Sequence, residues 1–171
     1  MLLDNHLDAS LDLANKRILA CHFIRSERLI FKAAREVVNF DVSPLPGLDL
    51  VMDFQDMRQL PDASFDGILS IHVFNHLPDD VKALSEAKRV LRPGGFLLST
   101  VGYTTVGPTQ NAADTSAHYG KENLTKFGVG TYRIYGVTDY EALLGRYFAT
   151  QTFNARDPWT DNTMKIFLSL K

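Results

Sequence analysis

The sequence predicts an α/β fold, a doubly wound sheet of seven strands that is mainly parallel and has an antiparallel last strand. Three observations lead to this fold. The chain has 171 residues, the size of one domain, and with 45% hydrophobic and 22% charged residues it can bury an ordinary core. Short apolar runs alternate with amphipathic segments up to Val101, which is typical of parallel strands joined by right-handed crossovers. Two β-rich runs near the C-terminus, separated by a turn-rich connection, indicate an antiparallel pair.

Hydrophobic periodicity and capping residues give the order of the elements. Leu3, Leu7 and Leu11 form an apolar stripe at helical spacing. Ser26 is the expected N-cap of a helix over 26–34, and residues 138–141 have the spacing of a capping box at the start of another helix. In chain order the predicted elements are a helix over 1–15, a strand over 17–21, a helix over 26–34, strands over 37–41, 48–54 and 65–74, a helix over 79–91, a strand over 96–101, a helix over 138–147, and strands over 150–153 and 164–170.

The helix over 79–91 is predicted to bury one face made by Val81, Leu84, Ala87 and Leu91, and the turn Arg92-Pro93-Gly94-Gly95 is predicted to stop it.

All 171 residues are interpreted as one domain, in which residues 102–137 stand apart. The stretch from Gly102 to Gly130 is rich in Gly, Thr, Asn and Ala and shows no sustained period. A stretch of this length inside a compact domain is usually functional. We therefore expect a lid or a substrate-side segment there.

Composition excludes several classes of function. The 18 Lys and Arg against 20 Asp and Glu give a formal charge of -2 without a long basic run, so no nucleic-acid partner is expected. Cys21 is the only cysteine, which rules out an internal disulfide and leaves a cysteine-based zinc site without ligands; no metal is expected. No apolar stretch approaches the roughly 20 residues of a membrane helix, and no signal peptide is readable in the first residues, so a cytoplasmic location away from the membrane is expected. The sequence does not fix the oligomeric state, and a homodimer is one option.

In an open α/β sheet, ligands bind beyond the carboxyl ends of the strands, where the strand order reverses. The residues to inspect are therefore 21–22, 41–43, 53–57 and 70–76. Asp41 can accept both hydroxyl protons of a ribose. Asp56 and Met57 offer a carboxylate for an exocyclic amine beside a soft contact for a purine.

Three segments in this order resemble one family. Residues 56–68 (DMRQLPDASFDGI), 72–77 (HVFNHL) and 89–96 (RVLRPGGF) are similar to the approach to strand four, its exit, and the turn before strand five of the type-11 group of class I S-adenosylmethionine-dependent methyltransferases, which have a Rossmann-like fold. Residues 127–136 (FGVGTYRIYG) resemble a segment that precedes the last helix in some members.

The resemblance implies S-adenosylmethionine as the cofactor and assigns a role to each matching position. It places Asp41 at the ribose hydroxyls, Val42 beside the adenine, and Asp56 and Met57 at the adenine amine and ring. Ser70, Ile71 and His72 fall where the strand-four exit passes under the methionine part. Ala20, Cys21 and His22 stand where the family has its glycine-rich first turn.

That first turn is where this chain departs from the family. No glycine occurs between Met1 and Gly47, so side chains occupy the space that the cofactor's methionine and ribose would need. We expect weakened cofactor affinity. His22 and Arg25 are candidates for the cofactor's carboxylate, with a surface role as the alternative for each.

Methyl transfer from a sulfonium needs little acid–base chemistry. The protein must align the acceptor with the methyl group and sulfur, exclude water, and remove a proton when the acceptor is an alcohol or a protonated amine. His72 and His76 are the candidate bases, and Tyr132, Arg133 and Tyr135 the candidate acceptor-side contacts. The expected function is methyl transfer to a small molecule, with a catalytically inactive binding or partner protein as the alternative. A thiol enzyme using Cys21 with His22 or His72, and a dinucleotide oxidoreductase, are disfavoured.

Overall fold

The computed structural model describes residues 13–21, 33–102, 104–117, 120–156 and 163–171. Most of the helices predicted over 1–15 and 26–34 lie outside these residues. Of the first, the described part is a 3-10 turn, η1 (Leu13–Asn15).

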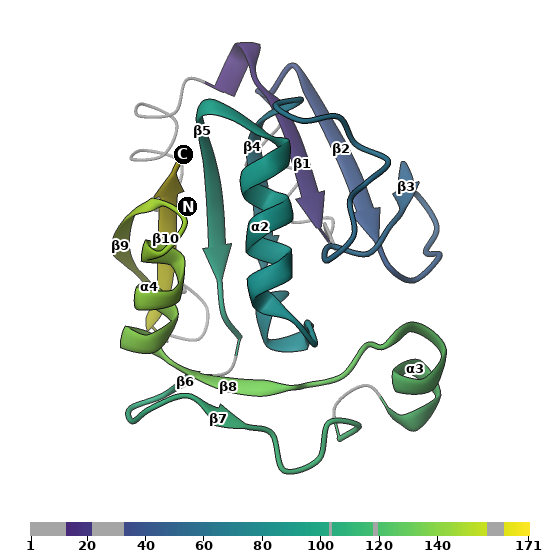
Figure 1. The fold of residues 1–171 in the computed structure, drawn as a ribbon, viewed down its shortest axis with the longest axis vertical. Coiled ribbons are helices and arrows are strands. Elements are labelled where there is room, and N and C mark those ends of the chain that lie inside the picture. The colour runs from purple at the N-terminus through teal and green to yellow at the C-terminus, as the bar shows by residue number, and fades with distance from the viewer. Residues whose placement is uncertain (1–12, 22–32, 103, 118–119, 157–162) are drawn as a thin grey trace.

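The described residues form a seven-stranded sheet in the order β3-β2-β1-β4-β5-β10-β9 (Figure 1). The first five strands pair in parallel, and β10 is antiparallel to both of its neighbours. This confirms the predicted fold class. The strands are β1 (Arg17–Cys21), β2 (Glu36–Asp41), β3 (Leu50–Val51), β4 (Phe65–Ile71), β5 (Leu91–Thr100), β9 (Ala149–Arg156) and β10 (Thr163–Leu170).

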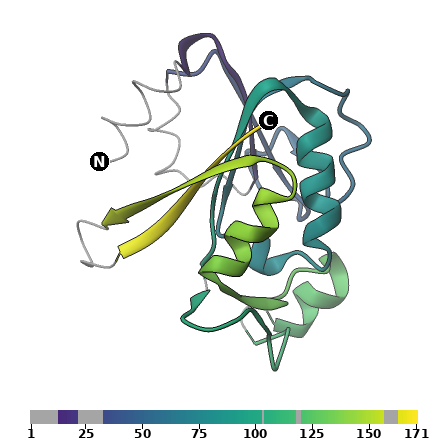
Figure 2. The same cartoon turned by 60° about the vertical axis from the view of Figure 1, so that its left-hand side comes forward.

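Apolar side chains on both faces explain why the strands read as continuous hydrophobic runs. Leu19 and Phe40 lie on one face, in the core beneath α2 (Asp80–Val90) and α4 (Val137–Gly145). Ile18, Leu69 and Leu98 belong to a second core on the opposite face. Figures 1 and 2 show α2 and α4 side by side on the same face of the sheet.

Two predicted elements end earlier than their apolar patterns suggested. The strand predicted over 65–74 stops at Ile71, because His72 takes a left-handed φ of 56° and a 3-10 turn, η3 (Phe74–His76), follows. Helix α2 ends at Val90 and buries Ala83, Leu84, Ala87 and Val90, so the predicted face was wrong at two positions. Val81 is exposed, and Leu91 already belongs to β5.

The Arg92–Gly95 turn does not simply separate a helix from a strand. It forms a bulge within β5, since the pairing with β4 moves from Phe65↔Leu91 to Gly67↔Phe96. A side chain is not tolerated at Gly95, where a Cβ would lie 2.9 Å from the Arg92 carbonyl oxygen.

The capping box predicted over 138–141 does not form. Helix α4 starts one residue earlier, with Gly136 as its N-cap and no side-chain cap. Asp139 instead accepts a hydrogen bond from the backbone N–H of Thr109 at 2.6 Å, and Glu141 accepts one from the Thr152 hydroxyl at 2.6 Å.

The 102–137 segment contains regular structure that its composition did not predict. It holds β6 (Thr104–Thr105), β7 (Gln110–Asn111), α3 (Gly120–Phe127) and β8 (Arg133–Gly136), with β8 between the other two strands. Figure 1 shows this segment beyond the arrowheads of β1, β2 and β5, at the carboxyl end of the sheet.

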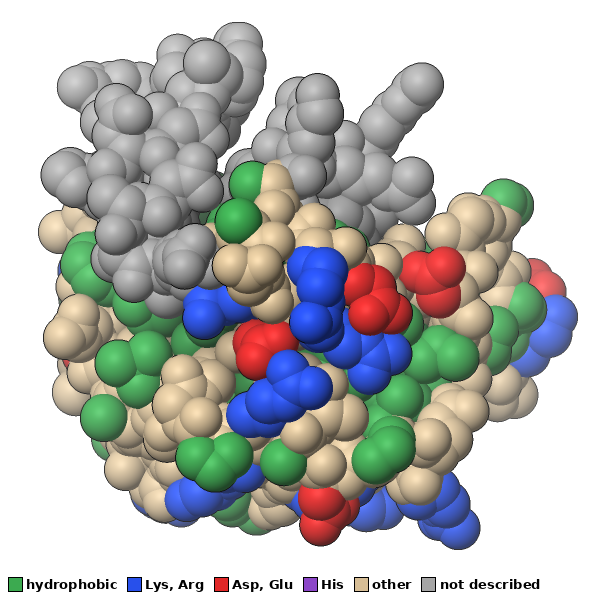
Figure 3. Space-filling model, turned by 90° about the horizontal axis from the view of Figure 1, so that it is seen from above, with side chains coloured by type: hydrophobic (Ala, Val, Ile, Leu, Met, Phe, Trp, Pro, Cys, Tyr) green, Lys and Arg blue, Asp and Glu red, His purple; other side chains and the backbone are tan. Residues whose placement is uncertain are grey.

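The opposite end of the sheet carries charges of both signs, interleaved in Figure 3. Arg17 pairs with Glu36 at 2.8 Å and Arg92 with Asp66 at 2.8 Å, so the amino ends of the strands are tied by ion pairs. No helix within the described residues is long and apolar enough to cross a membrane.

Candidate functional site

A cavity of about 500 Å³ lies at the carboxyl ends of β1, β2 and β4, between the sheet and α3. Strands β1 and β4 are neighbours although β2 follows β1 in the chain, so the cavity sits where the strand order reverses. Its volume suits a nucleoside-sized ligand. The described lining residues are Cys21, Asp41, Val42, Ser43, Pro44, Leu45, Met52, Asp53, Phe54, Gln55, His72, Val73, His76, Leu77, Pro78, Asn123, Lys126, Phe127, Gly128 and Val129.

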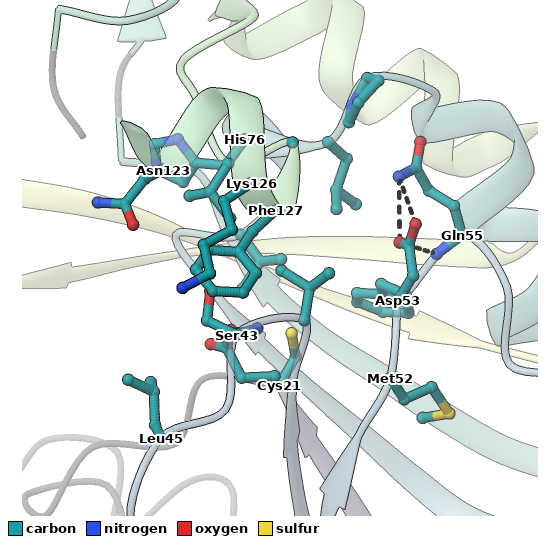
Figure 4. Close-up of a pocket in the computed structure, with 18 of the residues that line it drawn as sticks. Cys21, Ser43, Leu45, Met52, Asp53, Gln55, His76, Asn123, Lys126 and Phe127 are labelled. Atoms are coloured by element: carbon teal, nitrogen blue, oxygen red, sulfur yellow. Dashed lines mark hydrogen bonds between the residues drawn. The ribbon is translucent and has the colours of Figure 1, made fainter. Parts of the chain in front are cut away.

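Two carboxylates line this cavity, each fixed by its own turn. Asp41 ends β2, is 8% exposed, and accepts a hydrogen bond from the Ser43 N–H at 2.8 Å. Asp53 follows β3 and accepts from the Gln55 N–H at 2.8 Å and from Gln55 Nε2 at 3.1 Å (Figure 4). Gln55 Oε1 in turn accepts from the Asp79 N–H at 2.7 Å, which ties Asp53 to the start of α2.

Cys21, the last residue of β1, lines the cavity. Burial raises the pKa of its thiol well above the usual value, and the nearby Asp41 and Asp53 carboxylates raise it further. The thiol therefore stays protonated at neutral pH, which argues against the thiol-enzyme alternative.

His72 enters the cavity from the end of β4 in a strained backbone conformation. Its backbone N–H donates to the carbonyl and to the hydroxyl oxygen of Thr100, both at 3.2 Å. Gly102 leaves room for the imidazole, since a Cβ there would lie 3.2 Å from His72 Cγ. Partial burial lowers the pKa of the imidazole, so the ring is neutral at pH 7 and able to accept a proton.

His76 lines the cavity beside the 102–137 segment. Its Nδ1 lies 3.0 Å from the carbonyl oxygen of Gly130. A carbonyl oxygen only accepts, so Nδ1 carries the hydrogen and Nε2 is the basic nitrogen.

The neighbouring Asn75 is fully buried and connects three chain segments. Its Oδ1 accepts from the Gly102 N–H at 2.9 Å, and its Nδ2 donates to the Arg133 carbonyl at 2.9 Å. Its backbone carbonyl accepts from the Tyr132 N–H at 2.9 Å. Asn75 thus fixes the last part of the 102–137 segment against the cavity wall.

Tyr132, Arg133 and Tyr135, the acceptor-side candidates, do not line the cavity. The Arg133 guanidinium donates to the carbonyls of Leu77 at 2.6 Å and Pro78 at 2.8 Å. The hydroxyl of Tyr132 donates to the Gly128 carbonyl at 2.9 Å, and that of Tyr135 to Asp80 Oδ2 at 2.6 Å. In this arrangement all three side chains hold β8 and its approach in place.

The structure brings together only some of the residues that the sequence assigned to the cofactor. Cys21, Asp41, Val42 and His72 line the cavity. The others lie elsewhere: Ala20 and Ile71 face the second core, Asp56 pairs with Arg58 at 2.6 Å, Met57 is in the first core, Ser70 is fully buried with an unpaired hydroxyl, and His22 lies outside the described residues.

Sequence reasoning included residues 53–57 among those to inspect but did not assign Asp53, Phe54 or Gln55 to the cofactor, because the predicted strand ran on to Phe54 whereas β3 ends at Val51. It had no signal for Asn123, Lys126 and Phe127, because nothing local relates α3 to strand ends about 80 residues earlier in the chain. The described residues contain no group of three or more His, Cys, Asp or Glu side chains placed to hold a metal ion.

The strand order, with its antiparallel β10, defines the class of fold. The chain superposes on the 1,6-didemethyltoxoflavin-N1-methyltransferase of Burkholderia thailandensis, solved with bound S-adenosylhomocysteine, with a TM-score of 0.72 over 96% of this chain and 74% of that one. The two are 18% identical, so the likeness concerns the fold, which is the Rossmann-like fold of class I methyltransferases.

Sequence comparison gives a family match over part of the chain. Residues 29–99 match the family model described as a methyltransferase domain, which confirms the resemblance to the type-11 group. The chain is 38% identical over 73 residues to phthiotriol/phenolphthiotriol dimycocerosates methyltransferase 1 of Mycobacterium ulcerans, covering 43% of this chain and 26% of that protein. It is 31% identical over 97 residues to 27-O-demethylrifamycin SV methyltransferase of Amycolatopsis mediterranei, covering 56% of this chain and 34% of that protein. The chain thus spans about a third or less of the length of these relatives.

Proposed function

We propose that this chain binds S-adenosylmethionine in the cavity beside β1, β2 and β4 and transfers its methyl group to a small molecule. The observation that carries the proposal is the meeting of Asp41 and Asp53 in one nucleoside-sized cavity at the point where strand order reverses. The family match over residues 29–99 spans both carboxylates.

The residues of the cavity suit the chemistry of the cofactor. Asp41 would accept from the two ribose hydroxyls, and Asp53, rather than the surface residue Asp56, would accept from the adenine amine. Val42, Met52 and Phe54 offer apolar contacts for the adenine ring. The bound cofactor would supply a methyl group on a positively charged sulfur. After the transfer, S-adenosylhomocysteine would leave as a neutral thioether.

The chain's own part is to bind, align and accept a proton. His72 and His76 supply basic ring nitrogens at the end of the cavity formed by β4 and η3. Either can take the proton of a hydroxyl or protonated amine acceptor. Small-molecule acceptors are supported by the names of the similar proteins, which include 27-O-demethylrifamycin SV and 1,6-didemethyltoxoflavin methyltransferases.

Calorimetric titration with S-adenosylmethionine and S-adenosylhomocysteine tests the proposal. Asp41→Asn should weaken binding about 10- to 100-fold, because hydrogen bonds to a charged group contribute roughly 1.5–3 kcal/mol. Asp62→Asn is the matched control, because Asp62 lies away from the cavity with a 78% exposed side chain. No heat of binding with either ligand, or equal loss in both variants, contradicts the assignment.

One observation favours a second candidate, a methyltransferase-like protein that binds weakly and does not catalyse. The side chain of Cys21 occupies a position where the family has a glycine-rich turn. Crowding there predicts a dissociation constant above the low micromolar range (weaker than about -8 kcal/mol). Tight binding together with S-adenosylhomocysteine formation would eliminate this candidate.

A further inference from the structure

More acidic than basic side chains line the cavity. Asp41 and Asp53 supply two carboxylates, and Lys126 is the single Lys or Arg among the described lining residues. Cys21 stays protonated, and the lowered pKa of His72 leaves its ring neutral at pH 7. A ligand carboxylate entering this cavity would therefore meet two negative charges and one permanent positive charge.

Lys126 belongs to a helix face directed at the cavity. Asn123, Lys126 and Phe127 are spaced i, i+3 and i+4 on α3, so they share one side of the helix, and all three line the cavity. Figure 4 shows Lys126 and Phe127 reaching from α3 toward Cys21 and Ser43, at the ends of β1 and β2. The ammonium nitrogen lies 5.1 Å from the centre of the Phe127 ring.

This lysine has no acidic partner among the described residues, whose ion pairs all involve arginines. Helix α3 also buries none of its residues. Left-handed glycines bracket it, Gly120 with a φ of 78° and Gly128 with a φ of 69°. The cavity-facing side of α3 thus leaves contact surface and charge available to a ligand.

We infer that Lys126 holds the α-carboxylate of the amino-acid part of S-adenosylmethionine, with Phe127 closing the same wall; this rests on the proposed function. A family member with a glycine-rich first turn brings backbone close to the cofactor at β1, whereas this chain has Ala20 and Cys21 there. The charge that a carboxylate needs comes from the opposite side of the cavity, on α3.

Two ligands separate this role from simple packing. S-adenosylhomocysteine carries the carboxylate, and 5′-methylthioadenosine has the same nucleoside and thioether without it. Lys126→Met should weaken S-adenosylhomocysteine about tenfold or more and leave 5′-methylthioadenosine within about twofold, as loss of a charge-assisted hydrogen bond requires. Lys126→Arg should retain most of the affinity. Lys121→Met is the matched control, an exposed lysine on α3 that does not line the cavity.

Calorimetry on the unmodified chain and these variants tests whether Lys126 binds the carboxylate. Unchanged S-adenosylhomocysteine affinity in Lys126→Met, or an equal loss for both ligands, overturns the inference while leaving the proposed function standing. Arg25→Met removes the carboxylate candidate that follows the first strand in the sequence, and should have little effect. A selective loss of S-adenosylhomocysteine affinity in Arg25→Met, with Lys126→Met unchanged, assigns the carboxylate to Arg25 instead. No binding by the unmodified chain overturns the proposed function and this inference together.

Discussion

His72 adopts a backbone conformation that asparagine and glycine tolerate and most other residues avoid. A strained residue of this kind costs roughly 1–3 kcal/mol and persists only where its surroundings fix it. Two hydrogen bonds to Thr100 and the missing side chain at Gly102 do so here. The bifurcated hydrogen bond to Thr100 and the space at Gly102 therefore both direct this imidazole to the cavity, which supports its choice as a base.

Replacing His72 by Asn should change how stability depends on pH. Burial lowers the imidazole pKa in the folded chain below its ordinary 6.5, so the unfolded chain binds the proton more tightly. The folded state therefore loses stability as pH falls from about 6.5 toward the folded pKa, and is unaffected by this group above 6.5. His72→Asn keeps the left-handed backbone and should flatten that limb in urea denaturation between pH 5 and pH 8. Parallel curves for the two proteins would contradict the shift.

Single residues also mark where sequence reasoning stopped short. An apolar run over 48–54 does not reveal that pairing ends at Val51, so the residues just beyond the strand are Met52 to Gln55. Further on, the chain turns away from the cavity, because the Met57 N–H donates to Glu86 at 2.7 Å and the Met57 side chain is fully buried. The position of Asp41 at a strand end was predictable from the sequence, because β2 ends at Asp41, where the β-rich pattern also ends.

At the scale of elements, the long strands and α2 were predictable because burial dictates their sequence locally. Strands β6, β7 and β8 were not. Each has two to four residues, and β8 pairs with Thr104–Thr105 about 30 residues away. Their positions depend on a buried polar residue, Asn75, which no periodicity identifies as a link.

Asn75→Ala should therefore loosen the 102–137 segment and lower overall stability. The change removes the fully buried Asn75 amide and both of its part-buried hydrogen bonds, to the Gly102 N–H and the Arg133 carbonyl, at about 1–3 kcal/mol for each group that loses its partner. We expect the free energy of unfolding to fall by about 2–4 kcal/mol in urea denaturation at pH 7. Asn154→Ala, on the exposed part of β9, serves as control and should stay within about 0.5 kcal/mol. Equal effects in the two variants would show that Asn75 is not a structural link.

At the scale of the whole molecule, the cavity lies between parts of unequal packing. The sheet side is continuous with the first core through Phe54, Phe74 and Tyr140, whose rings contact one another in sequence at 5.6 and 5.7 Å. The other side is α3, which buries no residue. A ligand that touches both walls is therefore expected to couple a helix of low local stability to the sheet.

Hydrogen exchange with and without S-adenosylhomocysteine measures this coupling. In the free protein the amides of α3 should exchange far faster than those of β5, which lies in both cores. At about 100 times its dissociation constant the ligand adds roughly 2.7 kcal/mol to the free energy of unfolding. If Lys126 and Phe127 contact the ligand, exchange in α3 slows because opening the helix now requires release of the ligand. Lys126→Met should reduce that protection while β5 still gains whatever stabilisation the weaker binding supplies. A ligand that raises the melting temperature and leaves α3 exchange unchanged would mean that binding involves the strand ends alone, with α3 as a bystander.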